Sequence, residues 1–202
     1  MTAKEFIEQF NQTDQVVLLI GKRDVKPLDA PVLVQLGRWL AMNLPQATFR
    51  SGNASGADSL FIQGVASVTH AKIQIFAPYT THRPKKEYKP YLTGLDQVNL
   101  ANEPMVAYGL NTSNGRLVQS YLNQEENKLS AKGAYILRDC WMVFGDANRL
   151  PANVTIAYDD LSAPNQGGTG FTIQLCINKR VQIIKQNVWM RWLNENNLNE
   201  PI

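Results

Sequence analysis

The strongest constraint on the fold of this chain is a pattern that recurs along it: a short apolar run, a polar or glycine-rich turn, and then a stretch with helical spacing. The run at 15–20 is continuous and rich in β-branched residues, as in strands that are covered on both faces. Further strand-like runs occur at 47–49, 71–76, 154–158 and 181–184. Alternating strand and helix signals favour parallel strands joined by right-handed crossovers. The sequence therefore predicts an α/β fold with a doubly wound, mainly parallel sheet flanked by helices.

The segments between these runs predict helices, with two exceptions. Helical spacing appears at 1–13, from Pro27 or Pro31 onward, after residue 58, at 116–138 and at 171–177. The run at 140–144 (Cys-Trp-Met-Val-Phe) is interpreted as a fourth strand. Periodicity fails at about 77–113, which predicts a long irregular insertion that serves as a lid or a partner contact. We interpret residues 1–202 as a single domain.

Composition narrows the classes of function. The net charge of +3 over 202 residues is mild, so it does not indicate nucleic acid or an anionic membrane, and it makes nucleic acid an improbable partner. Cys140 and Cys176 lie in apolar runs, which favours reduced core thiols, and neither histidine has metal-ligand spacing. The chain shows no signal-peptide pattern and no apolar run of about 18 residues. We expect a cytoplasmic protein with no membrane partner, no metal and no cofactor.

Three polar turns follow predicted strands and are the candidate ligand-binding segments. Because the carboxyl ends of parallel strands share one edge of a doubly wound sheet, these turns are expected to line one crevice. Amide groups at a helix start bind phosphate or carboxylate, and Gly52 and Gly56 are predicted to supply positive φ angles there. The cations of the turns add positive charge, and Asp58 is predicted to orient its loop or to contact a ribose hydroxyl. The predicted ligand-binding residues are Gly21, Lys22 and Arg23 in the first turn, Arg50, Ser51, Gly52, Ala54, Gly56, Ala57 and Asp58 in the second, and Gly167, Gly168, Thr169 and Gly170 in the third.

The dinucleotide fingerprint G-x-G-x-x-G is absent after the first strand, because the glycine that follows Gly21 is Gly37. The turns instead resemble those of the SLOG superfamily, which includes DprA-like, LOG-type and YspA-like proteins. Gly21-Lys22-Arg23-Asp24 is similar to its G-[SGK]-R-D turn, residues 50–58 to its S-G-x-A-x-G-A-D loop, and residues 167–170 to its G-G-T-[GA] loop. The resemblance covers most of 15–185 but not 77–113. It implies a Rossmann-like fold that binds nucleotides or nucleotide-derived ligands, closest to the YspA-like branch.

The third turn departs from the LOG-type pattern P-G-G-x-G-T-x-x-E, which belongs to phosphoribohydrolases. Phe171 takes the threonine place and Gln174 the glutamate place, so the carboxylate that glycosidic cleavage needs is missing there. The acids in other segments that could supply it are Asp58, Asp139, Asp146, Asp159 and Asp160. No catalytic residue is assigned.

Three functions follow from these observations. The first is a nucleotide-binding sensor or sequestering module, with a small nucleotide-derived partner. The second is a nucleoside monophosphate N-glycosidase. The third is single-stranded nucleic-acid binding, for which the cations and tyrosines of the stretch 81–91 offer charge and stacking faces. An aromatic stripe near Trp189 leaves pairing into a homo-oligomer open.

Overall fold

A six-stranded sheet forms the centre of the protein, and all of its strand pairs are parallel. The computed structural model describes residues 1–52, 54–82, 91–125 and 127–195. The strands are β1 (Val16–Gly21), β2 (Thr48–Gly52), β3 (Ile73–Ala77), β4 (Leu92–Gly94), β5 (Val154–Tyr158) and β6 (Gln182–Ile184). The helices are α1 (Ala3–Phe10), α2 (Ala30–Asn43), α3 (Ala57–Ala66), η2 (Leu95–Gln97), α4 (Pro104–Leu110), α5 (Gly115–Leu122), α6 (Lys128–Phe144), α7 (Gly167–Asn178) and α8 (Gln186–Glu195).

The strand order β4-β3-β2-β1-β5-β6 places the topological switch point of the sheet between β1 and β5. The chain first builds the sheet outward from β1 to β4 and then returns to add β5 and β6 on the other side of β1. Ligands of open α/β sheets bind beyond the carboxyl ends of the strands at such a point. Here those ends are Gly21 and Tyr158, which are paired in register.

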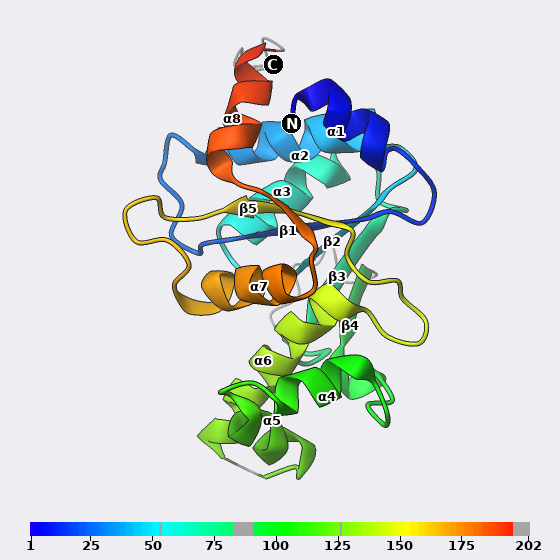
Figure 1. The fold of residues 1–202 in the computed structure, drawn as a ribbon, viewed down its shortest axis with the longest axis vertical. Helices are drawn as coiled ribbons and strands as arrows, with labels where there is room; N and C mark the ends of the chain where they lie inside the picture. Colours follow the sequence, from blue (N-terminus) through cyan, green and yellow to red (C-terminus); the bar gives the residue numbers. More distant parts are fainter. Residues whose placement is uncertain (53, 83–90, 126, 196–202) are drawn as a thin grey trace.

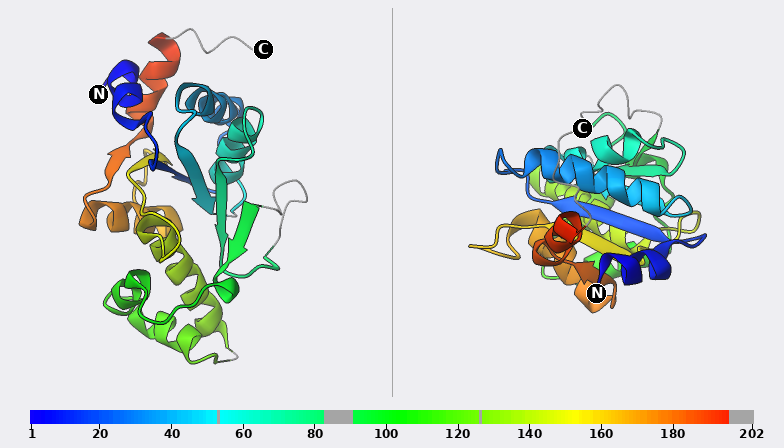
Figure 2. Two further views of the ribbon diagram at one scale, coloured as in Figure 1. Left: turned by 90° about the vertical axis from the view of Figure 1, so that its right-hand side faces the viewer. Right: turned by 90° about the horizontal axis from the view of Figure 1, so that it is seen from above.

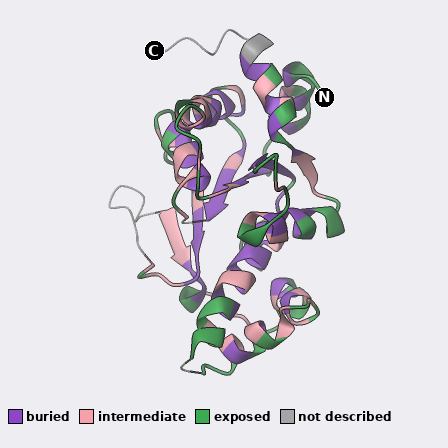
Figure 3. Ribbon diagram, turned by 90° about the vertical axis from the view of Figure 1, so that its left-hand side faces the viewer, coloured by how far each residue is buried: buried purple, intermediate pink, exposed green. Residues whose placement is uncertain are grey.

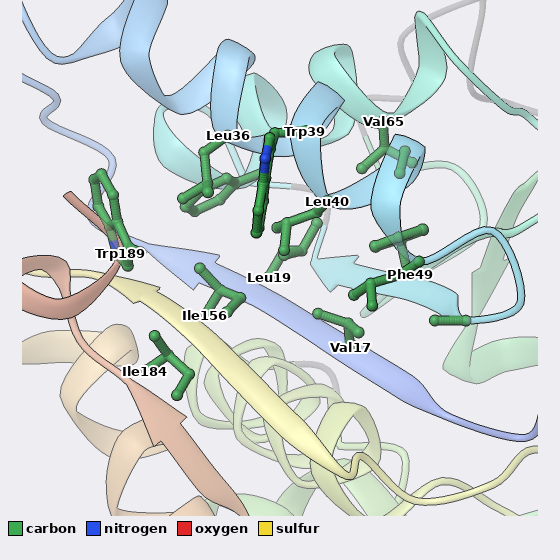
Figure 4. Close-up of a cluster of buried hydrophobic side chains, with 14 of the residues drawn as sticks. Val17, Leu19, Leu36, Trp39, Leu40, Phe49, Val65, Ile156, Ile184 and Trp189 are labelled. Carbon is green, nitrogen blue, oxygen red and sulfur yellow. The ribbon is translucent and has the colours of Figure 1, made fainter. Parts of the chain in front are cut away.

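Helices cover both faces of the sheet (Figures 1 and 2). Alternate residues of β1 serve the two faces: Val17 and Leu19 pack in the cluster under α1, α2, α3 and α8, whereas Leu18 and Ile20 pack in the cluster with α4 to α7. Figure 4 shows part of the first cluster, where Trp39 and Trp189 lie over the sheet, and Figure 3 shows the buried strands between the helices. The predicted α/β class, with a Rossmann-like arrangement, is confirmed.

The predicted strand at 140–144 is wrong, because these residues form the last part of α6. Cys140, Trp141, Met142 and Val143 are all buried, since this end of α6 packs against the sheet and also contacts α4 and α7. Partners on several sides let a helix be apolar all around, and such a run has no periodicity that separates it from a buried strand.

Two further expectations are corrected. The segment 77–113, predicted to be irregular, contains β4, η2 and α4 among its described residues. The aromatic residues of α8 do not form an exposed stripe: Trp189 and Trp192 are buried, and the Trp192 ring lies 4.7 Å from that of Phe6. In the ranges that the structure describes, no helix combines the length and the apolar character needed to cross a membrane.

Candidate anion-binding site at the carboxyl edge of the sheet

A cavity of about 500 Å³ lies beyond the carboxyl end of β1, at the topological switch point between β1 and β5. Its wall combines the turn after β1, the start of α3, the middle of α6 and the first turn of α7. This volume is in the range of small-molecule sites. The lining residues are Ile20, Gly21, Lys22, Arg23, Asp24, Ala54, Asp58, Arg138, Asp139, Met142, Gln166, Gly167, Gly168, Thr169 and Thr172.

The first turn of α7 brings backbone amides to this cavity. The helix begins at Gly167, whose φ is +65°, so the predicted third loop is itself the helix start. Among the described residues, the N-cap Gln166 makes no side-chain cap hydrogen bond, and the first intrahelical bond runs from Gly170 N to Gln166 O at 3.1 Å. The amides before Gly170 therefore lack intrahelical acceptors, at the positive end of the helix dipole.

The turn after β1 contributes two cations that differ in their surroundings. Lys22 Nζ lies 3.6 Å from Asp159 Oδ1 and donates to Gln166 O at 3.4 Å, so Lys22 ties this turn to the start of α7. Arg23 is exposed at the cavity, and its side chain makes no hydrogen bond or contact ion pair within the described ranges. Arg23 is thus a positive charge that remains available to an anion in the cavity.

Asp58 belongs to the structural frame of the cavity. Its Oδ1 accepts a hydrogen bond from Gly21 N at 3.0 Å, which joins the start of α3 to the end of β1. Burial raises the pKa of Asp58 to about 7, although Arg138 and the Gly21 amide act in the opposite direction. This contact joins Asp58 to the first turn, and the expected roles of Asp58, in orienting its own loop or in contacting a ribose hydroxyl, stay predictions.

Helix α6 adds a buried charge pair, Arg138 and Asp139, which are 7% and 5% exposed. Arg138 Nε lies 3.1 Å from Asp139 Oδ1, but the alignment is not that of a hydrogen bond, and Nε has no hydrogen-bond partner among the described residues. Burial raises the pKa of Asp139 to about 6, against the effect of Arg138 and Arg23. The cavity wall therefore contains a guanidinium whose buried Nε lies beside the Asp139 carboxylate and whose Nη1 donates to Met142 Sδ at 3.7 Å.

Gly52 makes room for Arg138. A Cβ atom at Gly52 would lie 1.8 Å from Arg138 Nη1 and 2.9 Å from Asp58 Oδ2. Gly52 is the last residue of β2 and is not among the residues with positive φ, so the prediction of a positive φ is wrong for Gly52 and confirmed for Gly56 at +83°. The missing side chain at Gly52 therefore leaves space for the Arg138 guanidinium of α6, and it does not serve a turn that needs positive φ.

The structure brings eight of the fourteen predicted ligand-binding residues to the cavity and places six elsewhere. Arg50 is fully buried beside Gln74, and Ser51 Oγ donates to Leu19 O at 2.6 Å. Gly52 faces Arg138, as described above. Gly56 packs against the Arg23 backbone, Ala57 N donates to Lys22 O at 3.0 Å, and Gly170 packs against the Asn165 backbone. The residues at the cavity are Gly21, Lys22, Arg23, Ala54, Asp58, Gly167, Gly168 and Thr169.

Sequence reasoning missed Arg138 as a cavity residue and named Asp139 only as one of several replacement acids. The available signal was an Arg-Asp pair inside an apolar stretch, since buried charges are rare without a partner or a function. Of the acids considered for glycosidic cleavage, Asp58 and Asp139 line the cavity, whereas Asp146, Asp159 and Asp160 are not among its lining residues.

Comparisons with known proteins give one result on the fold. No protein-family model and no curated protein sequence matches the chain. A solved structure of DNA processing protein A from Helicobacter pylori, from a study of its single-stranded DNA binding mode, is similar to 95% of this chain and 77% of that chain, with a TM-score of 0.48 and 16% identity. This finding overturns the expectation that nucleic acid is an improbable partner, which we withdraw. SLOG membership stays a prediction. The similarity to the DprA structure concerns the fold alone.

Proposed function

We propose that the cavity binds the phosphate group of a nucleotide. The observation that carries the proposal is the convergence of three anion-binding features on one space: the open amides of α7, the exposed cation of Arg23 and the buried guanidinium of Arg138. Helix starts hold phosphate through amide donors and the dipole, and guanidinium groups bind phosphate oxygens through charge-assisted hydrogen bonds. The volume of about 500 Å³ suits a single nucleotide.

The three features come from separate elements, which supports a site rather than an accidental hollow. Lys22 fixes the turn after β1 to Gln166 at the start of α7, and Asp58 fixes β1 to α3. These contacts join the elements around the cavity before a ligand arrives. Elements that are already joined need less ordering on binding, which favours affinity.

The test compares AMP with adenosine, which has the same base and sugar but no phosphate. Isothermal titration calorimetry is expected to detect AMP and not adenosine. Arg23→Gln is expected to weaken AMP binding roughly tenfold, because one charge-assisted contact is lost. Arg191→Gln, an exposed arginine on α8 outside the cavity, is the matched control and should leave the affinity unchanged. Equal binding of AMP and adenosine would contradict the proposal.

Single-stranded nucleic acid is the second candidate, and half-buried aromatic side chains favour it: Tyr135 lies beside Arg138 of the cavity, and Tyr79 and Tyr121 line a second pocket. The Tyr135 ring lies 6.0 Å from the guanidinium carbon of Arg138 and 5.5 Å from the His82 ring, and the rings of Tyr79 and Tyr121 lie 6.4 Å apart. Bases of single strands stack on such faces. The basic residues at 83–90 that also suggested this function lie outside the described residues.

Oligonucleotide length separates the two candidates. If the ligand is a strand, affinity should rise from one to about eight thymidine nucleotides and should weaken steeply as salt increases. If the ligand is a free nucleotide, AMP and the longer oligonucleotides should bind alike. Chromatography of the AMP samples for free adenine tests the N-glycosidase prediction in the same experiment, since Asp58 and Asp139 are the carboxylates that the cavity offers.

A further inference from the structure

Two buried carboxyl groups share one guanidinium inside the cavity. Asp58 on α3 and Asp139 on α6 both line it, and both interact electrostatically with Arg138, which precedes Asp139 on α6. With both acids ionised, the three side chains carry a net charge of −1. A proton on either acid makes the group neutral.

Asp139 also faces the part of the site where the anion is proposed to bind. Its Oδ2 lies 3.8 Å from the position that a Cβ atom on Gly168 would occupy. A carboxylate thus already lies beside the first turn of α7. A phosphate held by these amides meets this negative group at short range, in a buried setting where charge interactions are strong.

The other charged groups around Asp139 do not remove this conflict. The turn after β1 contributes Lys22, Arg23 and Asp24, but Lys22 is paired with Asp159 beyond β5, and Arg23 and Asp24 are exposed. From α6 the charged neighbour is Arg138, and from α3 it is Asp58, which brings a second negative charge. The residues of α7 that line the cavity are Gly167, Gly168, Thr169 and Thr172, none of which is charged.

We propose that the Asp58–Arg138–Asp139 cluster takes up one proton when a phosphate enters the cavity, so that the site binds the anion and the proton together. The proton is shared by the two acids, so it belongs to the pair rather than to one residue. Neutralising one acid removes the repulsion at α7 and leaves the other acid opposite Arg138. The raised pKa values of both acids mean that little free energy is needed to add the proton near neutral pH.

This inference rests on the proposed phosphate site and predicts how that site depends on pH. A ligand that brings one proton binds up to tenfold more weakly for each unit of pH increase. The useful range is pH 7.5–9, since the second pKa of a phosphate monoester is about 6 and the ligand itself no longer titrates.

The experiment measures proton uptake by calorimetry of AMP binding, or of oligo(dT) binding if only the oligonucleotide binds. Titrations at pH 7.5 in buffers of different ionisation enthalpy give the number of protons taken up, and we expect roughly 0.5–1 per ligand. Asp139→Asn and Asp58→Asn each leave one carboxylate opposite Arg138, which keeps it ionised, so uptake should fall towards zero in either variant. Using both variants covers the case in which one does not fold.

Asp24→Asn is the matched control, because it removes an exposed carboxylate from the same cavity. Its affinity for the anion can change, but its proton uptake should stay at the wild-type value. Binding without proton uptake in the wild-type protein overturns the inference and leaves the phosphate site intact. Absence of binding by both probes at every pH overturns the phosphate site, and this inference with it.

Discussion

Two buried arginines, Arg50 and Arg138, lie on the same side of the sheet and are used in opposite ways. Arg50 is fully satisfied: it donates to Gln74 Oε1 at 2.8 Å, to Met142 O at 3.0 Å and to Leu150 O at 2.7 Å, and it lies over the Phe76 ring. Arg138 lines the cavity and has a buried Nε without a hydrogen-bond acceptor in the described chain.

This difference distinguishes a buried arginine that stabilises the fold, Arg50, from a buried arginine that lines the candidate ligand site, Arg138. Burial lowers the pKa of Arg50 to about 9, yet the carbonyl and amide oxygens around it use its donors in holding the end of α6 against β2. Arg138 lines the cavity with one donor, Nε, that lies 3.1 Å from Asp139 Oδ1 without forming a hydrogen bond in the described chain, and it lies near the open start of α7. Unsatisfied buried donors are rare in folded proteins and call for a functional explanation. Each prediction below tests one side of this comparison.

The largest expected effect is on stability, from Arg50→Ala. The substitution leaves Gln74, Met142 O and Leu150 O without their donor in the core. Each buried acceptor left without a donor costs about 1–3 kcal/mol, so the three together should destabilise the protein by about 3–5 kcal/mol. Urea unfolding should show this loss, while AMP affinity of the folded fraction stays near wild type. A large loss of affinity at unchanged stability would reverse the assignment of the two arginines.

The second prediction concerns the pH dependence of stability. Aspartate has an ordinary pKa of 3.8, and burial raises the values of Asp58 and Asp139 to about 7 and about 6. Between pH 4 and 7 the folded state therefore holds more protons than the unfolded state, so the free energy of unfolding falls as pH rises. This stabilisation is complete below about pH 4 and is lost through pH 6–7.

Between pH 4.5 and pH 8 the fall should be smaller in Asp139→Asn by about 2 kcal/mol, because about 1.5 pH units lie between pH 4.5 and the raised pKa, and one unit corresponds to about 1.4 kcal/mol. Urea unfolding at pH 4.5 and pH 8 measures the difference. Asp24→Asn provides the control, because Asp24 is exposed. An equal fall in wild type and Asp139→Asn would show that Asp139 titrates as it does in the unfolded chain.

The third prediction is that Arg138→Gln affects binding more than stability. Loss of a charge-assisted hydrogen bond of about 1.5–3 kcal/mol weakens AMP binding roughly 10- to 100-fold. The two acids lose their cation and their pKa values rise further, so both become neutral near pH 7 and leave no unpaired charge in the cavity wall. Calorimetry and urea unfolding of the same sample measure both quantities. A stability loss as large as that of Arg50→Ala would make Arg138 a structural residue.

The smallest expected effect comes from Gly52→Ala. The added methyl group overlaps Arg138 Nη1, so the guanidinium must move within the cavity. Such overpacking costs about 1–3 kcal/mol of stability, and we expect the lower end because a side chain can shift. AMP affinity should fall severalfold, as measured by calorimetry. Gly168→Ala is the comparison for stability, since its methyl group meets Asp139 Oδ2 at an ordinary 3.8 Å.

The sequence was sufficient for the fold and for part of the site. The β-branched run of β1 and the turns after β1 and β5 are local signals, and they predicted the sheet edge on which Lys22 and Gly168 meet. Arg50 was assigned to the ligand because it precedes the glycine loop, but its side chain leaves β2 towards α6, which is decided by tertiary packing. Arg138 was missed because it lies far from the three turns in the sequence, and only the packing of α6 beside them brings its side chain to the cavity.

The first turn of α7 has a consequence for how the protein would respond to a ligand. Three of its first four residues are glycines, and each is about 1 kcal/mol less favourable than alanine in a helix. This turn therefore unwinds more readily than the apolar remainder of the helix. An anion that accepts hydrogen bonds from the amides of this turn stabilises its helical conformation. Occupancy of the cavity should therefore slow hydrogen exchange at Gly168 and Thr169, and the exchange rates of these two amides would indicate whether a ligand is bound.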